Sequence, residues 1–193
     1  GFRTTETASE DMLRDYVGSN PYQISDVVET TDANKFSEAM KSALGNRPNS
    51  AKQVDFVTPE KAQSILDTGG KLFLTKDNKA GAYVQVDGYM GGLFKDPKSK
   101  KTRAAKVLQD VRISAGGKFF DAFGETESIH LESTYIKNGF IPVARMEFNE
   151  EFAPENWEST TLSTRPENVF FVYAPDIQSS VGDGIVNNDY DSA

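Results

Sequence analysis

The sequence predicts a single α+β (mixed α/β) domain, in which helices flank a central mixed sheet that is mostly antiparallel. Three short apolar segments separated by turn residues, between positions 70 and 96, predict a β-meander. A helical pattern and another apolar segment follow at once, which predicts one right-handed parallel strand–helix–strand crossover. With 193 residues, the chain is long enough for one domain to bury a core without cross-links.

Two helices are expected before the meander. Apolar residues recur with helical spacing from Phe36 to Leu44, after Asp32 as a possible N-cap. Thr58 is a favourable N-cap, and Pro59 suits the first position of the second helix. A short strand is expected between the two helices, at 52–58.

The meander comprises segments 70–77, 79–87 and 89–96, with turns at Asp77–Asn78 and Asp87–Gly88. Beyond Pro97, a helix is expected from about Ser99, with an apolar face formed by Ala104, Val107, Leu108, Val111 and Ala115. The strands at 88–95 and 118–123 are therefore predicted to be parallel and adjacent.

The remaining elements are a helix at 127–139 that ends at Gly139 and strands at 140–149 and 168–175. We expect residues 31–177 to form the domain. Residues 1–30, a polar N-terminal extension, and residues 178–193, an acidic C-terminal tail, are expected outside the core because they contain too little apolar surface to offset the entropy of ordering.

Composition excludes several classes of function. Without cysteine the chain has no disulfide, catalytic thiolate or zinc–thiolate site, and the single His130 excludes a multi-histidine metal site, so no metal is expected. A net charge of −8 argues against general nucleic-acid binding. The sequence shows no signal peptide and no apolar run of the ~20 residues that span a bilayer, so a soluble protein without a membrane partner is expected.

One short segment is strongly basic despite the acidic whole. Six cations lie within twelve residues and are opposed only by Asp96; they are Lys95, Lys98, Lys100, Lys101, Arg103 and Lys106. Such a cluster indicates a local anion site. The alternative is a solvated loop with a solvated first helical turn. Within the preceding strand, Gly91 and Gly92 predict a β-bulge or a close backbone approach by a ligand, and a bulge without a ligand is the commoner case.

The stretch from Tyr135 through Gly139 and Phe140 into a strand resembles the "Y-x-x-x-G-F" helix–strand pattern of the GNAT family of N-acetyltransferases. The resemblance covers roughly residues 32–175. The combination of "GGLFKDP", "AGGKFFDAFG", "YIKNGFIPVARMEFNEEFAPENW" and "RPENVFFVY" is similar to GNAT-like proteins of tailed bacteriophages and prophages.

This resemblance implies that acetyl-CoA, as cosubstrate, lies in an opening between two parallel strands. Its pantetheine arm would follow Met90 to Phe94, its pyrophosphate would meet the start of the next helix, and Tyr135 would protonate the departing thiolate. The implied cofactor-binding residues are Gly91, Gly92, Leu93, Phe94, Lys98, Lys100, Lys101, Thr102, Arg103, Ala104 and Ala105.

The pyrophosphate turn departs from the family pattern. The family has "Q/R-x-x-G-x-G/A", whereas this chain has "KKTRAA", with Arg103 where the first glycine belongs. The Cβ of Arg103 obstructs a close approach by phosphate, but its guanidinium is suited to bidentate phosphate binding. A base that takes the proton of the amine is also required, and the candidates are Asp121 and Glu125. For both, an ordinary solvated carboxylate is the favoured alternative.

Two hypotheses follow. The first is a phage-encoded, acetyl-CoA-dependent N-acetyltransferase that transfers acetyl directly to an amine on a small molecule or host protein. The second is a catalytically inactive GNAT-like binding protein that associates with virion proteins or with a host partner. The expected location is the host cytoplasm or the virion.

Overall fold

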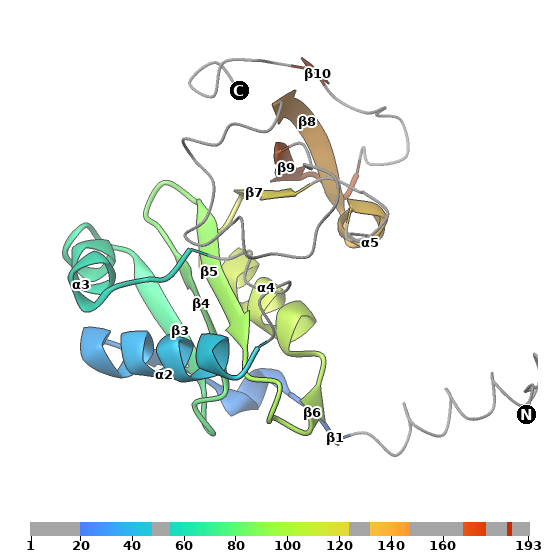
Figure 1. The fold of residues 1–193 in the computed structure, drawn as a ribbon. Coiled ribbons are helices and arrows are strands. Elements are labelled where there is room, and N and C mark those ends of the chain that lie inside the picture. Colours follow the sequence, from blue (N-terminus) through green and yellow to red (C-terminus); the bar gives the residue numbers. More distant parts are fainter. Residues whose placement is uncertain (1–19, 48–54, 124–131, 147–167, 177–184, 187–193) are drawn as a thin grey trace, which may run out of the picture.

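The computed structural model describes residues 20–47, 55–123, 132–146, 168–176 and 185–186 (Figure 1). In chain order, its elements are β1 (Asn20–Pro21), the 3₁₀ turn η1 (Ile24–Asp26), β2 (Val27–Thr30), α2 (Ala33–Gly45), α3 (Pro59–Asp67), β3 (Lys71–Thr75), β4 (Ala80–Val84), β5 (Met90–Lys95), β6 (Lys101–Thr102), α4 (Ala104–Ser114), β7 (Phe119–Phe123), α5 (Glu132–Lys137), β8 (Phe140–Met146), β9 (Asn168–Tyr173) and β10 (Ile185–Val186).

The strands form two four-stranded sheets and a small parallel pair. The first sheet has the order β2-β3-β4-β5, and all its neighbours are antiparallel. The second sheet has the order β10-β8-β9-β7, in which β9 is antiparallel to both β7 and β8, and β10 is parallel to β8. The predicted α+β class with a mostly antiparallel sheet is confirmed.

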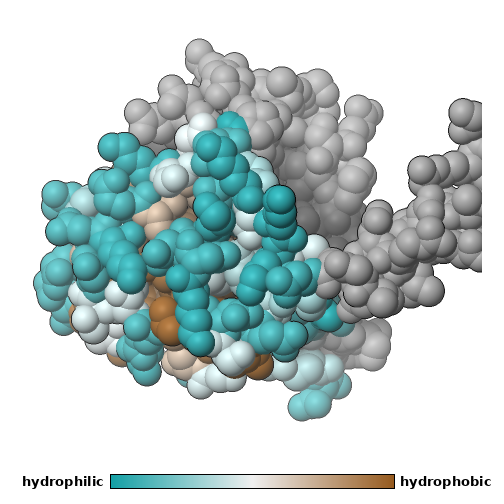
Figure 2. Space-filling view, turned by 90° about the horizontal axis from the view of Figure 1, so that it is seen from below, coloured by the Kyte–Doolittle hydropathy of each residue, from teal (hydrophilic) through white to brown (hydrophobic). Residues whose placement is uncertain are grey.

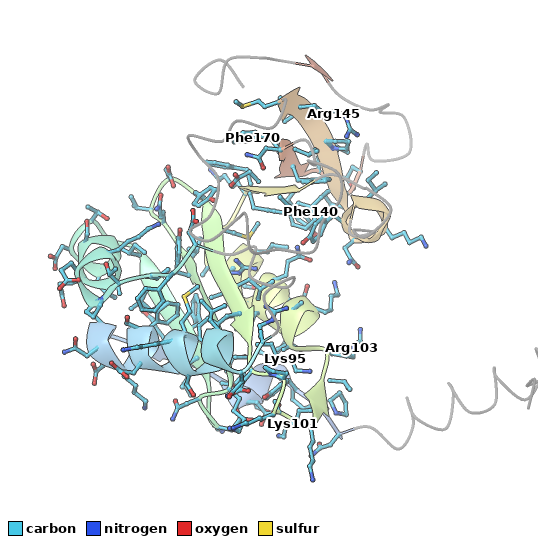
Figure 3. All side chains as sticks on the ribbon, viewed as in Figure 1. Lys95, Lys101, Arg103, Phe140, Arg145 and Phe170 are labelled. Carbon is cyan, nitrogen blue, oxygen red and sulfur yellow. The ribbon has the colours of Figure 1, made fainter. Side chains whose placement is uncertain are left out.

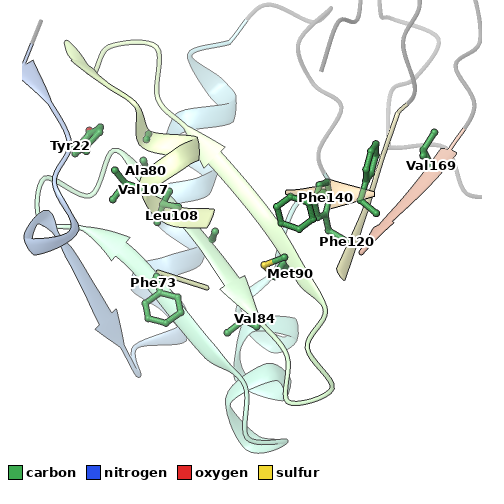
Figure 4. Packing of buried hydrophobic residues seen from close by; sticks show 13 residues of the cluster. Tyr22, Phe73, Ala80, Val84, Met90, Val107, Leu108, Phe120, Phe140 and Val169 are labelled. Carbon is green, nitrogen blue, oxygen red and sulfur yellow. The ribbon is translucent and has the colours of Figure 1, made fainter. Parts of the chain in front are cut away.

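Helices cover both faces of the first sheet (Figure 1). Successive strand residues point to opposite faces. Accordingly, Leu72 and Leu74 pack with α2 and α3, whereas Phe73 packs with α4. The cluster beneath α4 extends from the first sheet past Met90 to Phe120, Phe140 and Val169 of the second sheet (Figure 4). One continuous apolar cluster therefore joins the two sheets.

The crossover from β5 through α4 to β7 is parallel where its two strands meet, as predicted. The prediction that they are adjacent strands of one sheet is wrong, because β5 and β7 belong to different sheets and meet only near their first residues. The carbonyl of Gly88 accepts hydrogen bonds from the N–H groups of Lys118 (2.8 Å) and Phe119 (3.3 Å). Tyr89 and Phe119 form a single parallel bridge. Beyond it β5 pairs with β4 and β7 pairs with β9, so the facing edges of β5 and β7 are not hydrogen-bonded to each other. We call this unpaired region between the two strand edges the β5–β7 opening.

Three expectations about individual elements are wrong. Residues 20–30 belong to the folded core: β2 is an edge strand of the first sheet, and Tyr22 is buried. Residues 55–58, predicted as part of a strand, have no strand structure, although Val57 is buried and its carbonyl accepts a hydrogen bond from Ser37.

The third correction concerns α4. It begins at Ala104 rather than near Ser99, because Lys101 and Thr102 are extended and pair with β1. At the other end of the chain, the two residues of β10 lie along the edge of β8. None of the helices in the described residues is long and apolar enough to cross a membrane.

The two glycines of β5 sit at a β-bulge against one tyrosine. The register with β4 shifts between Gly81 and Tyr83, and Gly92 has a positive φ of 63°. A Cβ on Gly91 would lie 2.5 Å from the hydroxyl oxygen of Tyr83, and a Cβ on Gly92 would lie 2.6 Å from the ring. The predicted bulge is confirmed, and the ring of Tyr83 requires both glycines.

We expect Gly91→Ala to lower the free energy of unfolding by about 1–3 kcal/mol, the usual cost of overpacking a core. Chemical denaturation measures this change. Gly45→Ala is the control: the added methyl group at the end of α2 meets nothing within 4 Å, so the change should be neutral or slightly stabilising. Equal effects at the two positions would contradict the packing explanation.

Candidate functional site

The β5–β7 opening begins at the Tyr89–Phe119 bridge, and the chain passes from the far end of β5 into the turn that precedes α4. Parallel strands joined by a crossover helix bring the end of the first strand and the start of the helix to the same edge. The N–H groups at the start of α4, from Ala104 onward, have no carbonyl partner within the helix and carry the positive end of its dipole. This edge therefore favours an anion.

Hydrogen bonds from several parts of the chain hold the turn that precedes α4. Asp96 is buried and accepts hydrogen bonds from the backbone N–H of Lys98 (2.9 Å) and the amide of Asn46 (3.2 Å). The N–H of Tyr22 donates to the carbonyl of Thr102 (2.9 Å). The hydroxyl of Tyr22 bonds to Ser99 (2.6 Å) and to Asp77 (2.8 Å). Burial, the dominant cause, raises the pKa of Tyr22. The segment is thus held in one shape.

The six cations of this segment differ in their surroundings. Lys101 lies 3.7 Å from Asp26, and Lys106 lies 3.0 Å from Asp110. Lys98, Lys100 and Arg103 are exposed. Figure 3 shows Lys95, Lys101 and Arg103 gathered where β5, β6 and the start of α4 meet. Several positive charges therefore lie close to the free N–H groups of α4.

Arg103 adopts the backbone conformation for which glycine is preferred. It is the N-cap of α4, with φ 63° and ψ 25°. This left-handed conformation costs a non-glycine residue roughly 1–2 kcal/mol. The turn thus has a glycine-type shape although an arginine occupies it. The sequence pattern alone does not reveal this, because it gives the residue type but not φ.

The β5 residues that were predicted to bind the cofactor contribute mainly to packing. Gly91 and Gly92 accommodate Tyr83, as described above, and the ring of Phe94 is buried against Phe36 with 5.6 Å between centroids. Leu93 is partly buried beside the cluster under α4. Of the predicted side chains on β5, Phe94 thus belongs to the core, whereas Leu93 is only partly buried.

Tyr135 lies on α5 and packs edge-on against Phe120 (4.7 Å between centroids) and Phe171 (5.2 Å). Burial raises the pKa of its phenol, and the positive charge of Arg112 opposes that shift. Gly139 has φ 93°, and a Cβ there would lie 3.1 Å from side-chain atoms of Pro175 and Tyr173. Glycine thus lets the chain turn directly from α5 into β8.

Asp121 of β7 is hydrogen-bonded to Tyr89, which precedes β5, and to Asn168 of β9. Its carboxylate accepts hydrogen bonds from the hydroxyl of Tyr89 (2.5 Å) and from the amide of Asn168 (3.0 Å). Both oxygens are therefore engaged at the narrow end of the opening, which gives Asp121 a structural role, whereas its role as a base stays a prediction. Glu125, the other candidate, and His130 lie outside the described residues.

The sequence analysis missed Arg112. Although charged, it is buried on the inner side of α4, with 4% of its surface exposed. Its Nε donates to the carbonyl of Leu108 (3.2 Å) and its Nη1 donates to the carbonyl of Gly91 (3.3 Å). Burial lowers its pKa to about 10, so it remains charged at neutral pH. No pattern in the sequence distinguishes it from a solvated arginine.

A groove lies away from the turn before α4. The groove, of about 790 Å³, runs between the starts of α2 and α3, and its lining includes the carboxylates of Asp32, Glu60 and Asp67 but no lysine or arginine. Its acidic lining does not suit a phosphate-bearing ligand. Seen from below, the described face is largely hydrophilic, with small separate hydrophobic areas (Figure 2).

No protein-family model and no curated protein matches the chain. Among solved structures, an N-acetyltransferase from Staphylococcus aureus Mu50 is similar, with a TM-score of 0.50 and 14% identity over 77% of this chain and 96% of its own. This chain has a GNAT-type fold.

Two further solved structures have lower scores. YncA from Salmonella typhimurium, solved with its cofactor acetyl-CoA, has a TM-score of 0.48 and 11% identity over 78% of this chain and 95% of its own. A GNAT-family acetyltransferase from Staphylococcus aureus Mu50 has a TM-score of 0.43 and 13% identity over 78% of this chain and 98% of its own.

We expect Asp121→Asn to lower the free energy of unfolding by about 1.5–3 kcal/mol, the range for hydrogen bonds to a charged group. The asparagine amide keeps one acceptor and turns a donor toward Tyr89 or Asn168. Tyr89→Phe removes one of the same bonds, so a double-mutant cycle should show coupling between the two positions. If the two changes in the free energy of unfolding simply add, the hydrogen bond between Tyr89 and Asp121 does not contribute to stability as described.

Proposed function

We propose that this protein is an acetyl-CoA-dependent N-acetyltransferase that transfers acetyl directly to an amine. The observation that carries the proposal is that the β5–β7 opening ends at a cation-bearing helix N-terminus. A phosphate-bearing ligand with a long apolar arm fits such a layout, because its charged end meets the turn and its arm enters the opening.

The chain's own groups divide the work of binding. The N–H groups at the start of α4, with Lys98, Lys100 and Arg103, hold the pyrophosphate. Lys101, Thr102, Ala104 and Ala105 complete that turn. The left-handed Arg103 supports this fit, because the backbone there has the shape that the family obtains with glycine. The open edge of β5 from Gly91 to Phe94 orients the pantetheine arm.

Tyr135 is the general acid of the proposed reaction. Acetyl-CoA supplies a thioester carbonyl that the amine attacks. The phenol of Tyr135 then donates its proton to the departing sulfur. Since burial raises the pKa of this phenol, it is protonated at neutral pH, as an acid must be. Asp121 or Glu125 takes the proton of the amine, directly or through water.

The finer assignment rests on sequence motifs alone. We propose a phage-encoded enzyme whose acceptor is an amine on a small molecule or a host protein, acting in the host cytoplasm. A second candidate is an inactive GNAT-fold protein that binds a virion or host protein. Two observations favour this alternative: Arg103 has a Cβ where the family pattern has glycine at the pyrophosphate turn, and the hydrogen bond from Arg112 occupies the carbonyl of Gly91, a backbone group that a CoA arm would use.

Isothermal titration with acetyl-CoA separates the two functions. We expect binding that weakens with added salt, because exposed charges are screened within ~10 Å at 0.1 M. Arg103→Glu should weaken binding by about 1.5–3 kcal/mol through loss of a charge-assisted hydrogen bond. Arg103→Gly is the matched control: it keeps the turn conformation and removes only the side chain, so its affinity should be intermediate.

Tyr135→Phe completes the comparison. It should bind acetyl-CoA nearly as the wild type does but turn over more slowly, because the hydroxyl acts only as the sulfur departs. Absence of binding by the wild type at millimolar acetyl-CoA would exclude the enzyme and leave the binding protein.

A further inference from the structure

Tyr22 connects the N-terminal part of the fold to the turn before α4. Its side chain is 3% exposed, and its ring belongs to the apolar cluster beneath α4 (Figure 4). Its backbone N–H donates to the carbonyl of Thr102 (2.9 Å), directly after the pairing of β1 with β6. Figure 1 shows β1 and β6 side by side next to the start of α4. Tyr22 therefore holds the chain just before Ala104, the first residue of α4.

The phenol of Tyr22 belongs to a chain of hydrogen bonds with a fixed direction. Its single proton is donated to Asp77 (2.8 Å), whose carboxylate only accepts. The hydrogen bond between the phenol oxygen and Ser99 (2.6 Å) is therefore donated by Ser99. The hydroxyl oxygen of Ser99 in turn accepts from the backbone N–H of Lys101 (3.3 Å). Every donor thus points toward Asp77, and hydrogen bonds in such a chain strengthen one another.

The far end of this hydrogen-bond chain is anchored in the first sheet. Asp77 also accepts hydrogen bonds from the hydroxyl of Thr75 (2.6 Å) and from the backbone N–H of Lys79 (3.0 Å). Thr75 is fully buried at the end of β3. The turn before α4 is thus linked, through Tyr22 and Asp77, to a rigid part of the fold.

The side chain of Lys101 makes a second link between the turn and the N-terminal part. Its ammonium lies 5.4 Å from the centroid of the Tyr22 ring and 3.7 Å from the carboxylate of Asp26. A cation over the face of an aromatic ring is attracted to it. Both the phenol and the ring of Tyr22 therefore act on the same turn.

These links bear on the anion site because Arg103 has a strained backbone. A left-handed φ of 63° in a residue other than glycine persists only where the surrounding structure fixes it. Tyr22 fixes the two residues before Arg103: it bonds to the carbonyl of Thr102 directly and to the N–H of Lys101 through Ser99. The contacts of Tyr22 thus set the backbone that leads into the first N–H groups of α4.

We propose that Tyr22 is a positioning residue for the anion site at the start of α4. By holding Ser99, Lys101 and Thr102, it keeps the turn in the shape that receives the pyrophosphate of acetyl-CoA. This inference rests on the acetyl-transfer function proposed above. A site that is shaped before its ligand arrives loses less conformational freedom on binding, so the phenol of Tyr22 strengthens binding although it acts only through the turn.

Amide hydrogen exchange of the full chain without ligand tests whether Tyr22 holds the turn. Tyr22→Phe keeps the ring and removes the hydroxyl, and Ser99→Ala breaks the hydrogen-bond chain at the turn. We expect about three- to tenfold faster exchange at Lys101 and at Ala104–Lys106 in Tyr22→Phe, because a local opening there costs one hydrogen bond less. Ser99→Ala should have the same effect and serves if Tyr22→Phe does not fold. Unchanged exchange at the turn in the folded variant would overturn the proposal.

Thr58→Ala is the control for a general loss of stability. It removes the side chain that caps α3 by accepting from the N–H of Lys61 (3.2 Å). Helix α3 packs on the face of the first sheet opposite to α4. Exchange at the turn should therefore stay as in the wild type, and the same acceleration in Thr58→Ala would contradict a specific role of Tyr22.

Titration and kinetics with acetyl-CoA measure the effect on the site. Tyr22→Phe and Ser99→Ala should each weaken binding about three- to tenfold, the factor that corresponds to one net hydrogen bond. KM for acetyl-CoA should rise by the same factor with kcat unchanged, because the turn holds the ligand equally before and during the reaction. Thr58→Ala should bind acetyl-CoA as the wild type does.

The inference and the proposed function fail in different ways. If the wild type binds and turns over acetyl-CoA and Tyr22→Phe does so with the same KM, this inference alone is overturned. If the wild type binds no acetyl-CoA, the proposed function is overturned, and the exchange rates at Lys101 and at Ala104–Lys106 still decide whether Tyr22 holds the turn.

Discussion

The candidate site depends on the single parallel bridge between Tyr89 and Phe119. Had β5 and β7 paired along their whole length, the edge of β5 would be occupied by β7. Instead the hydrogen bonds to Gly88 join the strands at one end, and each then follows its own sheet. A bulge increases local twist and bends its strand. The bulge at Gly91–Gly92, filled by Tyr83, lies directly after the bridge and is thus positioned to cause the separation.

The same geometry explains why the charged groups lie where they do. Because α4 starts beyond the end of β5, its free N–H groups and the basic turn face the wide end of the opening. Because α4 runs back toward the start of β7, Arg112, two turns later, reaches the narrow end and the bulge. The crossover helix therefore places positive charge at both ends of the β5–β7 opening. The charge is exposed at the turn before α4 and buried at Arg112.

Local sequence signals predicted much of the fold. The Asp77–Asn78 turn, the Thr58–Pro59 helix start and Gly139 each fix backbone geometry within a few residues, and the structure has a turn, a helix and a positive φ at these places. Pairing over long distances was not predictable in this way. The bonding of Asn20–Pro21 to Lys101–Thr102 depends on contacts some 80 residues apart, and it brings residues 20–30 into the core.

For the candidate site, the sequence pointed to the basic turn and to Tyr135, whose roles stay proposals, but it did not reveal the conformation of Arg103 or the burial of Arg112. Arg103 is an arginine where the family pattern has glycine, yet it adopts the left-handed conformation that glycine favours. Arg112 reads as a solvated charge beside an apolar helix face, whereas tertiary packing buries it. Residue type is local information; φ and burial depend on the rest of the chain.

Amide hydrogen exchange with and without coenzyme A tests most directly that the β5–β7 opening is the ligand site. The account predicts slower exchange at Gly91–Phe94 and at Arg103–Lys106, with no change in the groove between α2 and α3. Protection of that groove, or of neither region at a ligand concentration that saturates binding, would contradict it.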